Sequence, residues 1–286
     1  MGSTDMKRAI VTGAASGFGR ALSLAFSREG CKVLLADIDK EGREETLGLI
    51  KKEGGSGEVI KCDVTSENDV KKMVDFAYKK WGGVDLMINN AGIGAGGAVG
   101  EFPMDQFRKV VDINFWGMVY GCNEIIPRMK KAGSGYIINV SSAAAFTTLP
   151  EMAAYNTSKA AVMALSETIY TELAPHNIGV TVVCPTFFNT NIIEDMAKGG
   201  RYPDESALEF GREGMKNAPM TADDIADKVA KAVKKGRLYV VPQPIARQMW
   251  LTKRLLPAFY YKQIAKLMKS GGHIEYFIKQ AKKGKA

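Results

Sequence analysis

The chain has 286 residues, of which 46% are hydrophobic and 24% charged, which suffices for one large packed domain or two small ones. Four cysteines without CxxC spacing predict buried thiols in a reducing compartment, with no disulfide and no metal site. The polar N-terminus lacks the features of a secretory signal, and no apolar run of about 18 residues occurs, so we expect a cytoplasmic protein without a membrane span.

Charge is distributed unevenly along the chain. The formal net charge is +8, but residues 228–286 hold fifteen Lys and Arg against one acid, Glu275, and the remainder is mildly acidic. This asymmetry predicts an anionic partner for the basic tail, unless the charges form only a solvated helical face.

Apolar runs rich in β-branched residues alternate with segments of helical periodicity. The expected strands are residues 9–12, 32–36, 58–62, 85–89, 136–140, 180–184 and 238–241, and the expected helices include 21–29, 67–81, 104–131, 153–173 and 222–235. This alternation predicts an α/β fold, a doubly wound seven-stranded parallel sheet of the Rossmann type. We expect a catalytic domain over residues 1–245 and a basic helical extension over residues 246–286.

A glycine-rich turn, TGAASGFG at residues 12–19, separates the first expected strand from the first helix. Gly13, Gly17 and Gly19 permit a tight turn, close approach of the backbone to a pyrophosphate, and packing of the helix on the sheet. Together with Ser16 and Phe18, they predict a dinucleotide site, because the turn opens a βαβ unit.

Asp37 ends the second expected strand, eighteen residues beyond Gly19. A carboxylate at this place accepts hydrogen bonds from the ribose hydroxyls of adenosine and repels a 2′-phosphate. Ser16 and Ile38 supply no cation for such a phosphate. NAD is therefore favoured over NADP, although Arg20 and Lys40 are close in sequence.

Further polar residues follow the third and fourth expected strands. They are Asp63 with Val64, and Asn90 with Ala91 and Gly92. Asp63 is a candidate for the adenine edge, but both groups also fit helix-capping or turn positions.

Tyr155 and Lys159 are four residues apart in an expected helix, so the ammonium lies near the phenol. A phenol with an ordinary pKa of about 10 needs a depression of roughly 2–3 units to act as a base near neutral pH. Lys159 and the cationic nicotinamide ring of an oxidised dinucleotide would both favour the phenolate. The pattern predicts hydride transfer with Tyr155 as acid/base.

Several motifs stand in the order typical of one family. They are TGAASGFG at 12–19, Asp37, Asp63-Val64, NNAG at 89–92, Asn114, the pair Ser141-Ser142 and YNTSK at 155–159. On these motifs, residues 6–241 resemble the classical short-chain dehydrogenase/reductase (SDR) family. The resemblance implies an NAD(P)-dependent oxidoreductase acting on CH–OH groups and assembling as a homodimer or homotetramer.

The resemblance also implies residue roles. Tyr155 would be the proton donor and acceptor, and Lys159 would lower its pKa and hold the nicotinamide ribose. Ser142, thirteen residues before the tyrosine, would bind the substrate oxygen in preference to Ser141. Asn114 would hold a water in a proton relay.

One departure from the family pattern follows the sixth expected strand. The usual Pro-Gly is Pro185-Thr186 here, which bears on the local backbone and on cofactor affinity. Phe188 and Thr190 complete the implied cofactor set, with Thr190 facing the nicotinamide carboxamide.

Apolar residues before Tyr155 and after the sixth strand predict a hydrophobic substrate pocket. The candidates are Phe146, Leu149, Met152, Phe187, Ile193 and Met196, together with Ser142. They favour a hydrophobic secondary alcohol or ketone (lipid-, steroid- or retinoid-like), unless they only pack the loop. A 3-oxoacyl-thioester reductase is a second hypothesis, and a catalytically silent NAD-binding scaffold a third.

Residues 248–268 have the pattern of an amphipathic basic helix interrupted at Pro257. We expect this segment to fold over the pocket or pack on a second subunit, or alternatively to make a peripheral membrane contact. Nucleic-acid binding is not expected, because the tail carries aliphatic residues at helical spacing rather than stacking aromatics.

Overall fold

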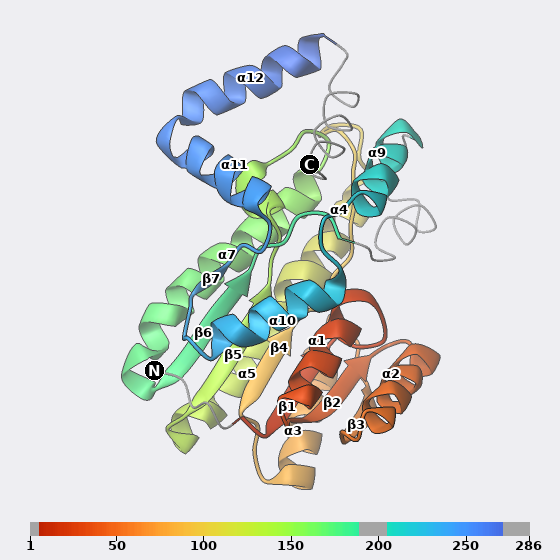
Figure 1. The fold of residues 1–286 in the computed structure, drawn as a ribbon, viewed down its shortest axis with the longest axis vertical. Helices are drawn as coiled ribbons and strands as arrows, with labels where there is room; N and C mark the ends of the chain where they lie inside the picture. Colours follow the sequence, from red (N-terminus) through yellow and green to blue (C-terminus); the bar gives the residue numbers. More distant parts are fainter. Residues whose placement is uncertain (1–5, 189–204, 271–286) are drawn as a thin grey trace.

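The central strands are buried on both faces, and alternate side chains point to opposite helical layers. In β1 (Arg8–Thr12), Ala9 and Val11 pack toward one layer and Ile10 toward the other. The neighbouring β2 (Lys32–Asp37) repeats this alternation. The computed structural model describes residues 6–188 and 205–270, and it confirms the predicted doubly wound sheet (Figure 1).

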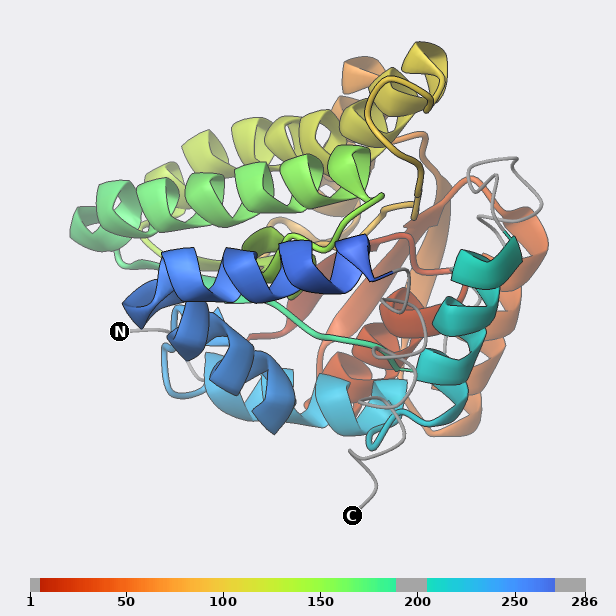
Figure 2. The same ribbon diagram turned by 90° about the horizontal axis from the view of Figure 1, so that it is seen from above.

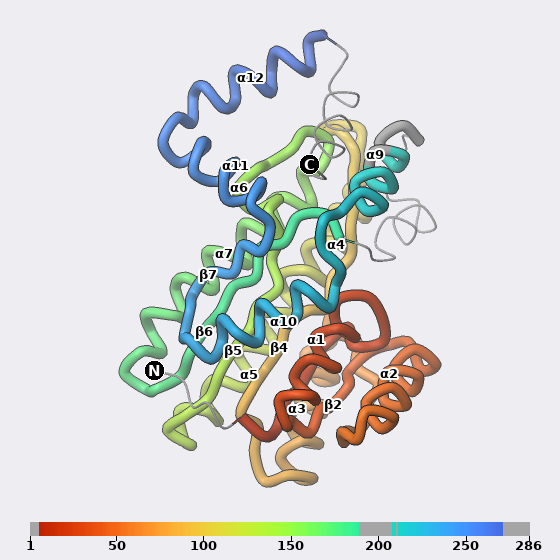
Figure 3. Tube along the Cα trace, in the orientation of Figure 1, coloured from red at the N-terminus to blue at the C-terminus, as the bar shows by residue number. Residues whose placement is uncertain are grey.

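All strand pairs are parallel, in the order β3-β2-β1-β4-β5-β6-β7. The other strands are β3 (Gly57–Lys61), β4 (Leu86–Asn89), β5 (Gly135–Val140), β6 (Ile178–Val183) and β7 (Tyr239–Val240). The direction of winding reverses between β1 and β4, a path that Figure 3 makes easy to follow. In open α/β sheets, ligands bind beyond the carboxyl ends of the strands at this switch point.

Helices cover both faces of the sheet (Figures 1 and 2). One layer contains α1 (Gly17–Arg28), α2 (Lys40–Lys52) and α10 (Ala222–Val233), and the other contains α3 (Glu67–Trp81), α5 (Gly117–Ala132) and α7 (Ala153–Leu173). Shorter elements are α6 (Ala144–Thr147), the 3₁₀ turn η2 (Ala174–His176) and α9 (Glu205–Lys216).

Two helical regions differ from the sequence-based expectation. The single helix expected over 104–131 consists of α4 (Met104–Val111), the π-helical turn η1 (Asp112–Trp116) and α5. A π turn has no apolar period of its own, and such turns are frequent at functional sites. The expectation also omitted α2, whose polar sequence shows little amphipathic pattern although Asp39 caps it by accepting a hydrogen bond from Gly42 N.

The tail forms two helices with a break at Pro257, as predicted. These are α11 (Pro244–Leu255) and α12 (Pro257–Lys269), which together we call the C-terminal arm. The expected boundary at residue 245/246 falls in the first turn of α11. Figure 2 shows α12 extending across the body above α6 and α11. None of the helices in the described part of the chain is both long and apolar enough to cross a bilayer.

Candidate active site

The turn between β1 and α1 is packed so closely that side chains are excluded at two of its glycines. Gly13 has φ +65°, and a Cβ there would lie 2.8 Å from Ala91 Cα. A Cβ on Gly19 would overlap the carbonyl oxygen of Gly13. The turn therefore presents bare backbone and the first N–H groups of α1 to the cavity, which suits a pyrophosphate.

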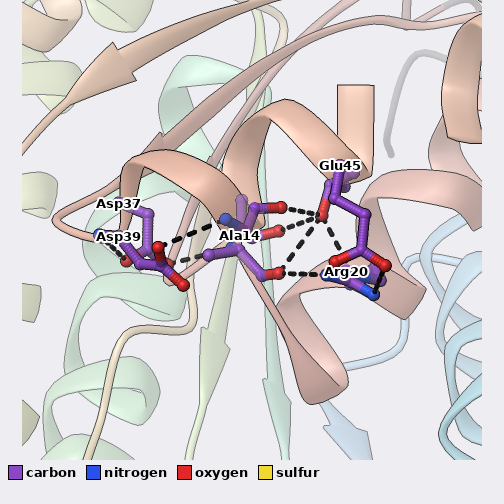
Figure 4. Close-up of polar contacts among 8 residues, drawn as sticks. Ala14, Arg20, Asp37, Asp39 and Glu45 are labelled. Carbon is purple, nitrogen blue, oxygen red and sulfur yellow. Dashed lines mark hydrogen bonds and ion pairs between the residues drawn. The ribbon is translucent and has the colours of Figure 1, made fainter. Parts of the chain in front are cut away.

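The Asp37 carboxylate is fixed by two backbone N–H groups at the edge of this turn. Ala15 N donates to Oδ2 at 2.9 Å, and Asp39 N donates to Oδ1 at 3.0 Å (Figure 4). The next side chain, Ile38, is 65% exposed and also lines the cavity. A negative charge thus stands at the place where an adenosine ribose would lie.

The sequence made Arg20 a possible cation for a 2′-phosphate, but its guanidinium has other partners in the structure. Its guanidinium pairs with Glu45 at 2.7 and 3.0 Å and donates to the carbonyl of Ala15. Figure 4 shows this pair on the opposite side of the turn from Asp37. The other open cation, Lys40, is exposed at the start of α2.

The residues after β3 and β4 combine cavity lining with turn formation. Asp63 Oδ1 accepts hydrogen bonds from the N–H and hydroxyl of Thr65 at 2.9 and 2.7 Å. Asn90 Nδ2 donates to the carbonyls of Thr12 and Gly13, which holds the glycine turn against β4. Asp63, Val64, Asn90, Ala91 and Gly92 all line the cavity.

Ser142, Tyr155 and Lys159 meet at the carboxyl end of β5. The Ser142 hydroxyl lies beside the Tyr155 phenol, and Lys159 Nζ lies 5.7 Å from the centroid of the tyrosine ring. Lys159 Nζ also donates to the carbonyl of Val140 at 3.0 Å. Ser141 instead turns away and donates to the Lys159 carbonyl at 2.7 Å, so Ser142 is the serine at the phenol.

Burial disfavours the charged forms of Tyr155 and Lys159. It raises the pKa of the Tyr155 phenol, against the opposing effect of the Ser142 hydrogen bond, and it lowers the pKa of Lys159 to about 8. Desolvation is thus the larger influence on the pKa of the Tyr155 phenol, and it raises that pKa although Lys159 lies nearby.

Asn114 lies in the π turn η1 and is fully buried. Its Oδ1 accepts from Ile93 N at 2.7 Å, and its Nδ2 donates to Ile93 O at 2.9 Å and to Ser158 Oγ at 3.1 Å. A Cβ on Gly92 would lie 3.1 Å from Asn114 Oδ1 and 3.3 Å from Lys159 Nζ. The amide therefore joins the segment after β4 to α7, close to the ammonium.

One cavity of about 1170 Å³ connects the glycine turn with Ser142, Tyr155 and Lys159. Beyond Tyr155 its wall is mostly apolar, and it includes Leu149, Met152 and Phe187, which the sequence singled out. Phe146 does not line it, because that ring is buried and stacks on Trp250 of α11 at a centroid distance of 5.3 Å. Thr190, Ile193 and Met196 lie outside the described residues.

The family model described as short chain dehydrogenase matches residues 7–199. The chain belongs to the short chain dehydrogenase family. The resemblance noted in the sequence is thereby confirmed.

Two curated relatives are similar to this short chain dehydrogenase. "Probable oxidoreductase EphD" of Mycobacterium tuberculosis is 34% identical over 253 residues, or 86% of the chain, and the chain spans 43% of EphD's length. The "3beta-hydroxysteroid dehydrogenase" of Mediterraneibacter gnavus is 35% identical over 195 residues, which are 68% of the chain and 70% of that protein.

Two solved structures share the fold. A short chain dehydrogenase/reductase from Burkholderia phymatum in complex with NAD has a TM-score of 0.82 and 29% identity, covering 89% of the chain and 95% of its own. A variant of actinorhodin polyketide ketoreductase with NADPH has a TM-score of 0.74 and 25% identity, covering 85% and 97%. Both structures contain a nicotinamide dinucleotide, which is NAD in the first and NADPH, with its 2′-phosphate, in the second.

Some site residues of this short chain dehydrogenase were missed by sequence reasoning. Gln243 is fully buried, accepts a hydrogen bond from Thr186 N at 3.1 Å and donates to Phe187 O at 3.4 Å, so it fixes the backbone where the family's glycine is replaced. Arg43 Nη1 donates to the carbonyl of Asp37 at 3.0 Å. Neither has a local signal in the sequence, because the partners of Gln243 are 56 and 57 residues away and Arg43 lies in the unexpected helix α2.

Proposed function

We propose that the chain transfers a hydride between NAD and a hydrophobic secondary alcohol or ketone, with Tyr155 as acid/base. The observation that carries this proposal is the shared cavity, in which the glycine turn and Asp37 stand at one end and Ser142, Tyr155 and Lys159 at the other. Gly13 and Gly19 fit a dinucleotide site because they leave bare backbone facing the cavity, and a Cβ there would collide with Ala91 or with the Gly13 carbonyl.

The protein's part in the reaction is placement and proton transfer, and the bound dinucleotide supplies or takes up the hydride. Tyr155 exchanges a proton with the substrate oxygen, and Ser142 donates a hydrogen bond to the same oxygen. In the oxidative direction the phenol must ionise, which the raised pKa of the buried side chain opposes. Positive charge beside the phenol, from protonated Lys159 and the oxidised nicotinamide, is what favours the phenolate.

Replacing Tyr155 by Phe tests the acid/base role. General acid–base catalysis contributes about 10²–10⁴-fold, so kcat should fall by that factor while the Kd for dinucleotide is unchanged. Tyr78→Phe removes the same hydroxyl on α3, outside the cavity, and as the control it should keep full turnover. Retained turnover in Tyr155→Phe would refute the proposal.

The proposed preference for NAD rests on Asp37 and on the engagement of Arg20 by Glu45. Asp37→Ser should lower kcat/KM for NAD by about tenfold to hundredfold, because a hydrogen bond to a charged group contributes about 1.5–3 kcal/mol. The preference is measured as the ratio of kcat/KM for the two dinucleotides. A wild-type protein that prefers NADP would contradict this part of the proposal.

An apolar substrate is supported by the wall of the cavity beyond Tyr155, where Met215, Pro219 and Met249 join the predicted Leu149 and Phe187. The relative that is a 3beta-hydroxysteroid dehydrogenase is consistent with a bulky apolar alcohol. A panel of hydrophobic secondary alcohols with NADH absorbance as readout tests this class, and turnover confined to short polar alcohols would exclude it.

We also propose a homodimer or homotetramer formed through α5 and α7. Asn114 lies directly before α5, and Tyr155 lies in α7. Trp116 and Tyr170 are 45% and 37% exposed, which leaves aromatic surface beside these helices for a second subunit. Sedimentation velocity of the full chain measures the assembly, and a monomer at micromolar concentration would exclude it.

A further inference from the structure

Four large apolar side chains are exposed at the junction of α11 and α12. Leu251, Leu255, Leu256 and Phe259 are 57%, 74%, 57% and 54% exposed, and we call them the elbow patch. They belong to the end of α11, to Leu256 between the helices and to the start of α12, and Figure 1 shows the turn between these two helices projecting from the body. Exposure of several neighbouring large apolar residues is unusual for a soluble surface and indicates a contact site.

The arm is attached to the body by other side chains, so the elbow patch is not needed to hold it. Trp250 stacks on Phe146 and meets the ring of Tyr239 edge-on at 5.1 Å. Tyr260 is buried and donates a hydrogen bond to the carbonyl of Thr147 at 2.9 Å. These contacts fix the orientation in which the elbow patch faces outward.

The charged side chains of the C-terminal arm all have one sign. The arm contains Arg247, Lys253, Arg254, Lys262, Lys266 and Lys269, and the sequence has no acid from residue 228 to residue 270. All of these bases except Lys253 are largely exposed. An amphipathic helix with apolar residues on one side and lysines beside them is the form that binds in the plane of an anionic membrane surface.

The same helix lines the substrate cavity. Ile245, Gln248 and Met249 of α11 form part of the cavity wall. Gln248, Leu251 and Leu255 are spaced three and four apart, so one row of side chains leads from that wall to the elbow patch. A surface that contacts the elbow patch therefore lies beside the apolar end of the cavity.

We propose that the elbow patch docks on a membrane surface rich in anionic phospholipid, with its apolar side chains among the lipid headgroups and the flanking Lys and Arg on the phosphates. A second copy of the chain fits less well, since a two-fold contact through this face would bring the same basic side chains together. The docking proposal does not depend on the proposed reaction, and the Tyr155→Phe variant should dock equally well.

Co-sedimentation of the full chain with vesicles tests the proposal. Vesicles of phosphatidylcholine alone are compared with vesicles containing about one third phosphatidylserine, at low salt and at roughly 0.5 M salt, where charge attraction is screened. We expect binding to the anionic vesicles, weaker binding at high salt, and loss of binding in Leu255→Ser/Phe259→Ser. Dinucleotide binding and the thermal midpoint of each variant show that it is folded.

A matched pair of double variants isolates the charge of the arm. Lys262→Gln/Lys266→Gln should lower the partition coefficient by about tenfold to thirtyfold, since each basic residue near such a surface contributes about 1 kcal/mol. Lys51→Gln/Lys52→Gln makes the same change of net charge at the far end of α2 and should have no such effect.

Three results would overturn the docking proposal. One is a protein that stays in the supernatant with anionic vesicles, and another is equal binding by Leu255→Ser/Phe259→Ser. The third is sedimentation velocity without vesicles showing that this double substitution dissociates an oligomer, which would assign the elbow patch to a second copy.

Discussion

Replacing Lys159 by Met should change how the stability of the protein depends on pH. Burial lowers the pKa of Lys159 from 10.5 to about 8, so the folded chain favours the neutral amine. Below about pH 8 the folded state holds a buried ammonium at a cost that the unfolded chain does not bear. Methionine has similar length and no charge, so the variant lacks this cost.

The size of the effect follows from the shift. A difference of roughly 2.5 units corresponds to about 3 kcal/mol, at about 1.4 kcal/mol for each unit. Between pH 8 and 10.5 the unfolded chain keeps a proton that the folded chain has lost, so wild-type stability rises with pH. The part of the variant's advantage in free energy of unfolding that comes from the missing buried charge should therefore be full at pH 7 and disappear by about pH 10.5.

Urea denaturation of both proteins without added dinucleotide, from pH 7 to pH 10, measures this difference. Loss of the hydrogen bond from Lys159 to the Val140 carbonyl shifts the difference by a constant and leaves its slope unchanged. The titration of Tyr155 is present in both proteins and cancels to first order. A difference that stays flat over this range, or grows with pH, would refute the reasoning.

Three substitutions test other parts of the site. Gly19→Ala should abolish dinucleotide binding measured by NADH fluorescence, because the new Cβ would overlap the carbonyl of Gly13, whereas Gly48→Ala, with open space at its Cβ, should bind normally. Gln243→Ala should lower the free energy of unfolding by about 1–3 kcal/mol, since it removes the buried amide that bonds Thr186 N and Phe187 O; an unchanged urea midpoint would contradict this. Trp250→Ala should release the C-terminal arm and accelerate tryptic cleavage at Arg254, and an unaltered rate would contradict the anchoring role.

Most of the fold follows from local sequence patterns. The strands are recognisable because Ile10, Val33 and Ile137 belong to short apolar runs buried from both sides. The turn at residues 12–19 and the spacing of Tyr155 and Lys159 are local as well. These patterns involve residues close in sequence and can be recognised without the structure. The cofactor and catalytic candidates chosen from them line one cavity.

The remaining features depend on contacts that a single sequence does not reveal. The engagement of Arg20 by Glu45 joins α1 to α2, which the pattern did not predict, and Gln243 acts on a segment far away along the chain. Phe146 is apolar and near Tyr155 in sequence, yet packing against Trp250 turns it into the core. The raised pKa of Tyr155 is likewise a consequence of burial, which spacing on a helix does not determine.

Because Arg20 and Arg43 already have partners, changing the coenzyme preference from NAD to NADP would require substitutions at two positions. Neutralising position 37 would remove the repulsion of a phosphate but would leave Arg20 tied to Glu45 and Arg43 tied to backbone carbonyls. Such a variant would lose the hydrogen bonds to the ribose of NAD without gaining a cation that binds the 2′-phosphate of NADP. Ile38 is exposed and lines the cavity, so an arginine introduced there would have room to bind the 2′-phosphate.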